Sequence, residues 1–182
     1  MRGRLKVFGL TLGYWLVFFW AARVLFLAYH APRTATLGAG ELVRTFGQGF
    51  RLDASGAAYL TAVPSLLLIV ATLLPVTGIA RRLAFGWVAA VTVLGAATIA
   101  ADLELFRHWD HRIDGSVIRY LATPAEALAS TGGTPRLLLV AIAVLLAGGC
   151  LWLYRRAVHP AWQRLERVHP PGRCRCCCPV SW

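Results

Sequence analysis

Four runs of apolar residues alternate with polar connections along the chain, at about residues 7–29, 57–76, 83–106 and 137–154. Each run is close to the about 20 residues with which a helix, rising about 1.5 Å per residue, crosses a hydrocarbon core about 30 Å thick. The pattern predicts an all-α fold, a polytopic membrane bundle of about four transmembrane helices within residues 1–168. The first run exceeds the roughly 7–15 apolar residues of a signal-peptide core, so we expect it to remain as an anchor.

The composition also indicates a membrane protein. Of the 182 residues, 58% are hydrophobic and 15% are charged, whereas soluble domains average about 45–50% and about 25%. The net charge of +11 would also suit a nucleic-acid-binding protein. However, the arginines flank the apolar runs instead of forming one basic face. We therefore expect the lipid bilayer, and no nucleic acid, as the partner.

The charges between the apolar runs indicate the orientation of the chain. Residues 2–6 and 81–82 carry cations without any acid, and residues 155–175 carry six arginines against one glutamate. Residues 30–56 and 107–135 mix cations with acids. The positive-inside rule then places both termini in the cytoplasm and both mixed loops outside. Because all cations but one are arginine, codon usage favours a GC-rich bacterium, and so a bacterial inner (cytoplasmic) membrane.

One proline, Pro64, lies inside the second apolar run. Proline lacks the N–H that would bond to the carbonyl four residues earlier, and it breaks helices of soluble proteins. In membrane spans a neighbouring helix satisfies the freed carbonyl. We therefore interpret Pro64 as a kink within the second helix, and not as a helix boundary.

Both outer loops contain amphipathic stretches. In the second loop, Ile113, Val117 and Leu121 recur every four residues, which is typical of one helix face. The first loop has a weaker apolar stripe, formed by Leu42, Val43, Phe46 and Phe50. Two interpretations stay open. The stretches are either short helices in the membrane plane, with their apolar faces among the acyl chains, or ordinary loops packed on the bundle.

Three charged residues lie within the runs: Arg23 in the first, and Asp102 and Glu104 near the outer end of the third. Such groups cost about 2.5–3.5 kcal/mol at a membrane centre. By helical rise, Arg23 lies about 26 Å beyond Lys6 and Asp102 about 30 Å beyond Arg82, so both reach a similar depth in the outer leaflet. Either each side chain extends to the outer surface, or Arg23 and Asp102 form an interhelix pair.

His108, Asp110 and His111 resemble a cluster of metal ligands. A zinc site needs three or four converging ligands, and the spacing of these three suits neither one helix face nor one strand face. We expect a polar and aromatic belt at the membrane interface instead. The sequence therefore predicts no metal ligand, no cofactor-binding residue and no catalytic residue in this chain.

Residues 169–182 differ abruptly in composition from the rest, because they hold four of the five cysteines, at positions 174 and 176–178. Clustered cysteines bind soft metals, and cytoplasmic ones are targets of palmitoylation. The C-x₂-C pairing of structural zinc sites is missing. We expect a disordered tail, and the composition break suggests an out-of-frame reading or an artificial end.

Two phrases of the sequence resemble a known family. The first runs from Gly49 through Arg51, Asp53 and Ser55 to Pro64, and the second extends over residues 102–130. They resemble the membrane part of the bacterial lipoteichoic acid synthase and phosphoglycerol transferase family, sulfatase-like enzymes of the alkaline phosphatase superfamily. The resemblance covers about residues 5–165.

The resemblance implies several N-terminal helices, usually five, followed by a large extracytoplasmic α/β domain. That domain would hold a divalent metal, manganese or zinc, and a Thr or Ser nucleophile that moves a phosphoglycerol group from a lipid to an acceptor. Here only four runs are present, and residues 159–165 resemble the loop before a fifth helix. No catalytic position of the family has a counterpart, so we expect the chain alone to be inactive.

The sequence thus predicts the membrane-anchor domain of a truncated sulfatase-like phosphoglycerol transferase. The alternative is a complete small four-helix inner-membrane protein that acts as a subunit or scaffold. A transporter is disfavoured, because few polar groups lie at the midplane. Arg51, Asp53, Arg112 and Asp114 are the candidate outer-surface contacts to anionic lipid headgroups or to the missing domain. Otherwise these four residues only cap helices and pair with each other.

Overall fold

The computed structural model describes residues 2–36, 38–73, 77–109 and 136–168. The amphipathic stripe that begins at Ile113, and the cysteine-rich tail, therefore lie outside the described residues. The same holds for Asp110 and His111 of the supposed ligand cluster, and for Arg112 and Asp114.

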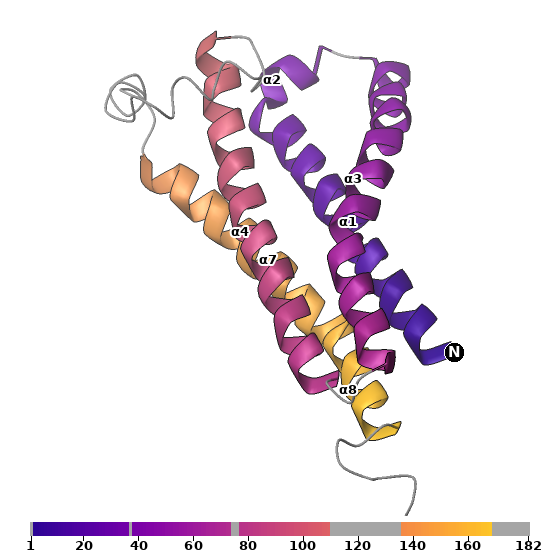
Figure 1. The fold of residues 1–182 in the computed structure, drawn as a ribbon. Helices are drawn as coiled ribbons and strands as arrows, with labels where there is room; N and C mark the ends of the chain where they lie inside the picture. The colour runs from indigo at the N-terminus through magenta and orange to yellow at the C-terminus, as the bar shows by residue number, and fades with distance from the viewer. Residues whose placement is uncertain (1, 37, 74–76, 110–135, 169–182) are drawn as a thin grey trace, which may run out of the picture.

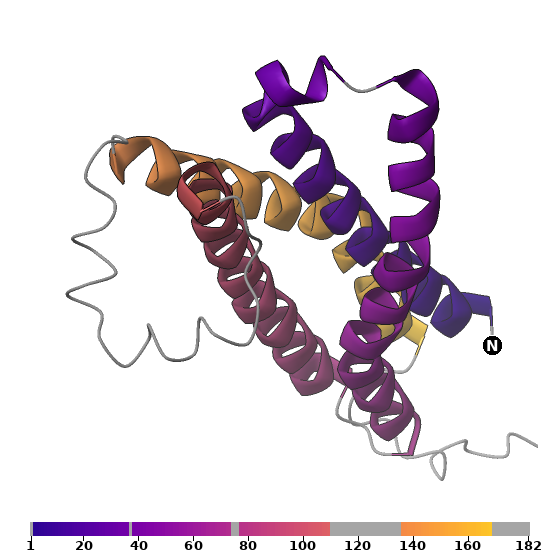
Figure 2. The ribbon, with the colours of Figure 1, turned by 90° about the horizontal axis from the view of Figure 1, so that it is seen from above.

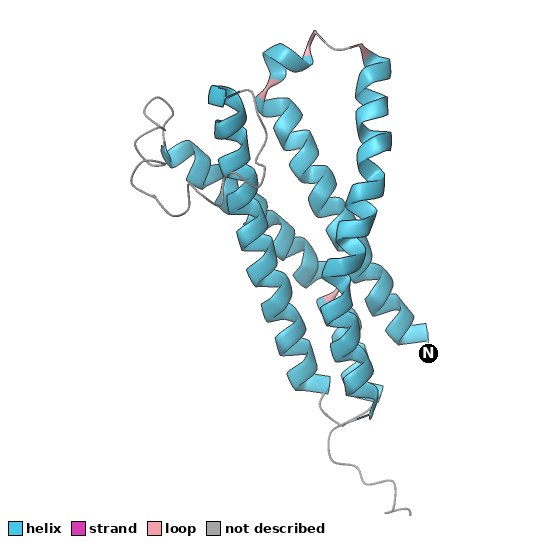
Figure 3. Cartoon of the chain, turned by 45° about the horizontal axis from the view of Figure 1, so that its top comes forward, coloured by secondary structure: helices cyan, strands magenta, loops and turns pink. Residues whose placement is uncertain are grey.

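Every secondary-structure element in the described part is a helix (Figure 3). The four long helices are α1 (Arg2–Tyr29), α3 (Ala39–Leu73), α4 (Thr77–Trp109) and α7 (Arg136–Ala157). The short α2 (Ala31–Thr34) lies between α1 and α3, and the short α8 (His159–Val168) follows α7. The four long helices are each long and apolar enough to cross a membrane. The prediction of an all-α, multi-pass membrane bundle is confirmed.

The long helices form two pairs that lie against each other, α1 with α3 and α4 with α7 (Figures 1 and 2). We call "outer end" the end that carries α2 and the N-terminus of α3, and "inner end" the end that carries the N-terminus of α1 and α8. At the outer end α1 still contacts α4, whereas the N-terminal ends of α3 and α7 lie on opposite sides of the bundle (Figures 1 and 2).

Helix α3 begins well before the expected second span. Its 35 residues give about 52 Å of helix at about 1.5 Å per residue, against a hydrocarbon core of about 30 Å. The stripe from Leu42 to Phe50 lies in its first turns, and not in a separate helix in the membrane plane. Figure 1 shows this outer part of α3 leaning away from α1.

Pro64 lies inside α3, which continues on both sides of it. Proline leaves the carbonyl of Leu60 without its usual helical donor. The indole nitrogen of Trp87 on α4 donates to this oxygen over 3.2 Å. A neighbouring helix thus supplies the donor for the carbonyl that Pro64 leaves free, as predicted from the sequence.

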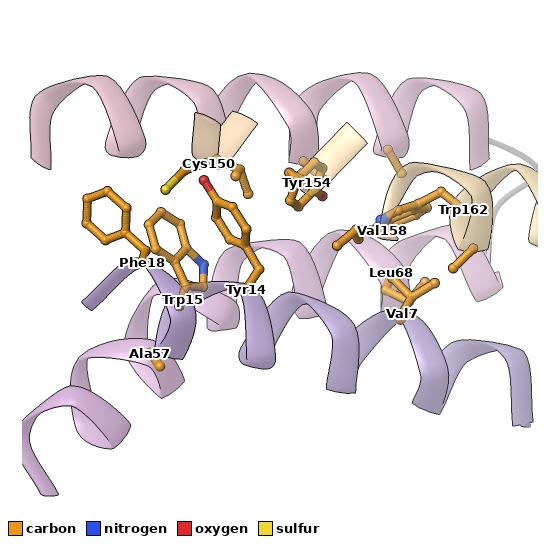
Figure 4. Packing of buried hydrophobic residues seen from close by; sticks show 14 residues of the cluster. Val7, Tyr14, Trp15, Phe18, Ala57, Leu68, Cys150, Tyr154, Val158 and Trp162 are labelled. Carbon is orange, nitrogen blue, oxygen red and sulfur yellow. The ribbon is translucent and has the colours of Figure 1, made fainter. Parts of the chain in front are cut away.

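The interior of the bundle is aromatic. Tyr14, Trp15 and Phe18 on α1 are buried, together with Tyr154 on α7 and Trp162 on α8 (Figure 4). The ring of Tyr14 contacts those of Trp15 and Tyr154 edge-on, at centroid distances of 5.1 and 5.2 Å, a favourable arrangement of aromatic quadrupoles. Since lipid is as apolar as these rings, close packing and not escape from water holds the helices together.

Small residues allow the helices to approach. A Cβ atom at Gly95 of α4 would lie 3.0 Å from the ring of Phe18, and one at Gly56 of α3 would lie 3.1 Å from the ring of Phe19. Ala96 and Ala100 are buried on the same helix as Gly95. Gly95, Ala96 and Ala100 thus serve packing within the chain, whereas Ala97 and Ala101 are exposed.

Helix α8 covers the inner end of the bundle. Val158, Ala161 and Trp162 are buried, whereas Arg164 is exposed. A Cβ atom at Gly3 of α1 would lie 2.9 Å from Leu165 Cδ2, so this glycine gives α8 its place against α1. The segment that resembles a loop before a fifth helix is therefore an amphipathic helix packed on the other helices.

Candidate functional site

The most polar junction between the spans lies in the outer half of the bundle, where α1 meets α3. The Nη2 atom of Arg23 donates to both carboxylate oxygens of Asp53, at 2.9 and 2.8 Å. Its Nη1 atom donates to the backbone oxygen of Thr45, at 2.7 Å. One guanidinium thereby joins two points of α3 that are eight residues apart.

Gly49 makes room for this guanidinium. Thr45, Gly49 and Asp53 follow one another at intervals of four residues, so they share one face of α3. A Cβ atom at Gly49 would collide with Nη1, Cζ and Nη2 of Arg23. The missing side chain is therefore what lets the charged group lie against the α3 backbone.

Aromatic rings cover the same site. The Cζ atom of Arg23 lies 5.7 Å from the ring centroid of Phe46, within the range of a cation–π contact. Trp20, one turn before Arg23, meets Phe46 edge-on at 6.1 Å. The side chains of Arg23 and Asp53 are 18% and 11% exposed. Both charges are thus largely removed from solvent and satisfied by each other.

Arg23 forms its ion pair with Asp53, a pairing that neither interpretation of the sequence included. Asp102 lies half-buried on α4. Helical rise gives the depth of a residue but not its direction around the helix, and Asp53 was assigned to a loop that is in fact helical. Arg23 also does not extend freely to the surface.

The candidate surface contacts of the first loop separate into two kinds. Arg51 is exposed, as a contact to headgroups or to another domain requires. Asp53 is only 9% exposed and bonds to Arg23, so its carboxylate serves the interhelix pair. The roles of Thr45 and Gly49 in this site were not predicted, although their four-residue spacing from Asp53 is visible in the sequence.

A second polar junction lies at the outer ends of α1 and α4. Glu104, only 2% exposed, accepts a hydrogen bond of 3.2 Å from the hydroxyl of Tyr29. The ring of His30 lies 4.6 Å from that of Phe26 and 4.9 Å from that of Phe106. Its Nδ1 lies 3.1 Å from the carbonyl oxygen of Phe26, so Nδ1 carries the proton. The carboxylate and the aromatic rings together join α1 to α4.

Apolar residues of α1 and α7 line an open groove of about 630 Å³. It extends from Val17 to Ala28 on α1 and from Ile142 to Leu146 on α7. A groove without polar groups, on the outside of membrane-spanning helices, suits acyl chains and offers no group for chemistry.

Within the described residues, no three His, Cys, Asp or Glu side chains come together as a possible metal site. The manganese or zinc that the family resemblance implies therefore finds no set of ligands among them.

Comparisons of the sequence with protein-family models and with curated proteins, and of the fold with solved structures, gave no match.

Proposed function

We propose that this chain is the membrane-anchor domain of a sulfatase-like phosphoglycerol transferase in a bacterial cytoplasmic membrane, with both termini in the cytoplasm. The observation that carries the proposal is the place on α3 where the guanidinium of Arg23 binds, against Thr45, Gly49 and Asp53. We call this place the seat of Arg23. Gly49 and Asp53, two residues of the phrase that resembles the family, form this seat. The resemblance thus coincides with a physical requirement of the bundle.

The outer ends of α1, α3 and α4 would form a rigid surface, which we call the platform. The outer part of α3 leans away from α1 (Figure 1), and Arg23 bonds it to α1 at Thr45 and Asp53. The Tyr29–Glu104 hydrogen bond joins α1 to α4 at the same end. A catalytic domain resting on this surface would be held at a fixed height and angle.

Arg51 is the described residue that this proposal assigns to guidance. It is an exposed arginine on the outer part of α3, two residues before the buried Asp53. A guanidinium binds phosphate through two parallel hydrogen bonds. Arg51 would hold the phosphate of a lipid headgroup, or a carboxylate of the domain, at the platform. The metal and the nucleophile would belong to that domain, and no step of the transfer is assigned to this chain.

Affinity purification of the tagged chain from the source bacterium's membranes, in mild detergent, tests the proposal. The eluate is assayed for manganese-dependent transfer of phosphoglycerol from phosphatidylglycerol. Because this chain alone would be inactive, activity requires that the catalytic domain copurifies with it as a separate polypeptide. We expect such activity with the unaltered chain and a reduced amount with Arg51→Gln. The exposed Arg82, near the inner end of α4, supplies the matched control Arg82→Gln. An inactive eluate that contains this chain alone would contradict the proposal.

The alternative, a small four-helix scaffold, has one observation in its favour. Gly148 and Gly149 are exposed on α7, and a Cβ atom at either would meet no described atom within 4 Å. Paired small residues on a lipid-facing surface let another helix approach closely. If the chain is a scaffold, Gly148→Leu should abolish its association in bilayers, measured by energy transfer between labelled copies, and the eluate should lack transferase activity.

A further inference from the structure

At the inner end, residues of three helices line a small open cavity that takes no part in the proposed anchoring. Phe85 of α4, Arg155 of α7 and His159 of α8 line it, and its volume is about 300 Å³. Ligand pockets range from about 300 to about 1,000 Å³. This cavity therefore suits a small polar group better than a whole lipid or cofactor.

The guanidinium of Arg155 is held in place by an aromatic ring. The Cζ atom of Arg155 lies 5.0 Å from the ring centroid of Phe85. The ring of Phe85 in turn lies 6.0 Å from that of the buried Tyr154. A guanidinium stacked on a fixed ring loses less freedom when it binds a ligand.

His159 reaches the cavity because α8 is fixed. It is the first residue of α8 and is half-buried. The neighbouring Val158 and Trp162 are buried in the core (Figure 4). The imidazole and the guanidinium thus come from two different helices, and both can donate hydrogen bonds to one anion.

The cavity lies at headgroup depth. Arg155 is 19 residues beyond Arg136, the start of α7, which corresponds to about 28 Å of helix, close to the about 30 Å of a hydrocarbon core. The surrounding chain is basic: residues 2–10, 77–90 and 150–168 carry nine Lys or Arg residues against one acid, Glu166. Arg155 and Arg156 are both exposed, but Arg156 stacks on Trp152 and does not line the cavity.

We infer that this cavity is a binding site for the phosphate of an anionic glycerophospholipid. Arg155 holds the phosphodiester, His159 donates a further hydrogen bond, and the acyl chains follow the apolar surface of α4 and α7. Lipids place their charged phosphate groups at this depth. Free phosphate could reach the cavity only from the aqueous side. Anionic lipids are drawn to such basic ends of membrane proteins. The inference rests on the membrane-spanning assignment and not on the transferase proposal.

Native mass spectrometry of the full chain in detergent tests this site, with phosphatidylglycerol as the probe and phosphatidylcholine of equal chain length as its neutral counterpart. We expect phosphatidylglycerol to bind more tightly. Arg155→Gln should weaken its binding about tenfold, the effect of losing one charge-assisted hydrogen bond. The matched variant Arg156→Gln, which removes a neighbouring cation outside the cavity, should change the dissociation constant less than about twofold.

Three results would overturn the inference. Equal weakening by Arg155→Gln and Arg156→Gln would mean a diffuse basic surface. Equal binding of phosphatidylcholine would mean that the phosphate's net charge is not recognised. Displacement by inorganic phosphate at the same concentration would mean a site for small anions. If Arg155→Gln does not fold, as judged by circular dichroism, Arg155→Lys takes its place. It keeps the charge but loses the planar fork, so it should also bind more weakly than Arg156→Lys.

Discussion

The indole nitrogen of Trp87 on α4 lies 3.2 Å from the carbonyl oxygen of Leu60 on α3, the acceptor that Pro64 leaves without its helical donor. The two residues join the helices at the one place where α3 cannot satisfy itself. Trp87→Phe should lower the free energy of unfolding by about 1 kcal/mol, the net value of a typical hydrogen bond. Unfolding in mixed micelles, followed by circular dichroism, measures this change.

A second variant tests whether Pro64 is the reason that the Trp87–Leu60 hydrogen bond stabilises the bundle. Pro64→Ala supplies the missing N–H, so the carbonyl of Leu60 regains an intrahelical donor. In this background Trp87→Phe should cost less than in the unaltered chain, because the oxygen is no longer left unsatisfied. An equal cost in both backgrounds would show that Trp87 acts through its packing and not through this hydrogen bond.

Gly49 offers a sharp test of the site at α1 and α3. Replacing an exposed helical glycine by alanine normally stabilises by about 0.5–1 kcal/mol. At Gly47, where a Cβ atom meets no described atom within 4 Å, we expect this gain. At Gly49 the methyl group would displace the guanidinium of Arg23, so Gly49→Ala should destabilise by about 1–3 kcal/mol, the range for hydrogen bonds to charged groups. Thermal unfolding of both variants compares them, and a similar gain at both positions would exclude the seat.

Pairwise coupling identifies the partner of Arg23. Arg23→Gln and Asp53→Asn each break the ion pair, so the double variant should be less destabilised than the sum of the two, by about 0.5–3 kcal/mol. The same cycle with Asp102→Asn should be additive within about 0.5 kcal/mol. Measured free energies of unfolding decide between the partners: a larger coupling with Asp102 would restore the pair that the sequence suggested.

Much of the fold was predictable because the membrane leaves few choices. A span must be helical and about 20 residues long, so apolar length alone located all four helices. The length of α3 was missed because Gly47, Gly49 and several polar residues make its first turns look like a loop. In the structure, the hydrogen bonds of Arg23 to Thr45 and Asp53 fix this part of α3 to α1. The amphipathic pattern of α8, by contrast, was present in the sequence and could have been recognised.

The pairing of residues in the candidate site was even less predictable from the sequence than the length of α3. Arg23 and Asp53 are 30 residues apart, and which acid meets an arginine depends on how two helices are turned toward each other. Depth follows from counting residues, but direction around the helix follows from packing. Trp15 and Phe18 turn α1 so that its aromatic face is inside, and this leaves Arg23 facing α3. The polar pair is thus set by the aromatic core.

That core contains one polar contact of its own, which links α1 to α4. The hydroxyl groups of Tyr14 and Thr92 lie 2.6 Å apart, and both residues are buried. Tyr14→Phe and Thr92→Val should each destabilise the bundle, and the coupling between them should be about 0.6 kcal/mol, the average for such bonds in membrane bundles. Thr98→Val serves as control, since Thr98 is exposed on α4 and bonds only within its own helix. A coupling of Tyr14 to Thr98 as large as that to Thr92 would show that the effect spreads through helix packing and does not come from the hydrogen bond.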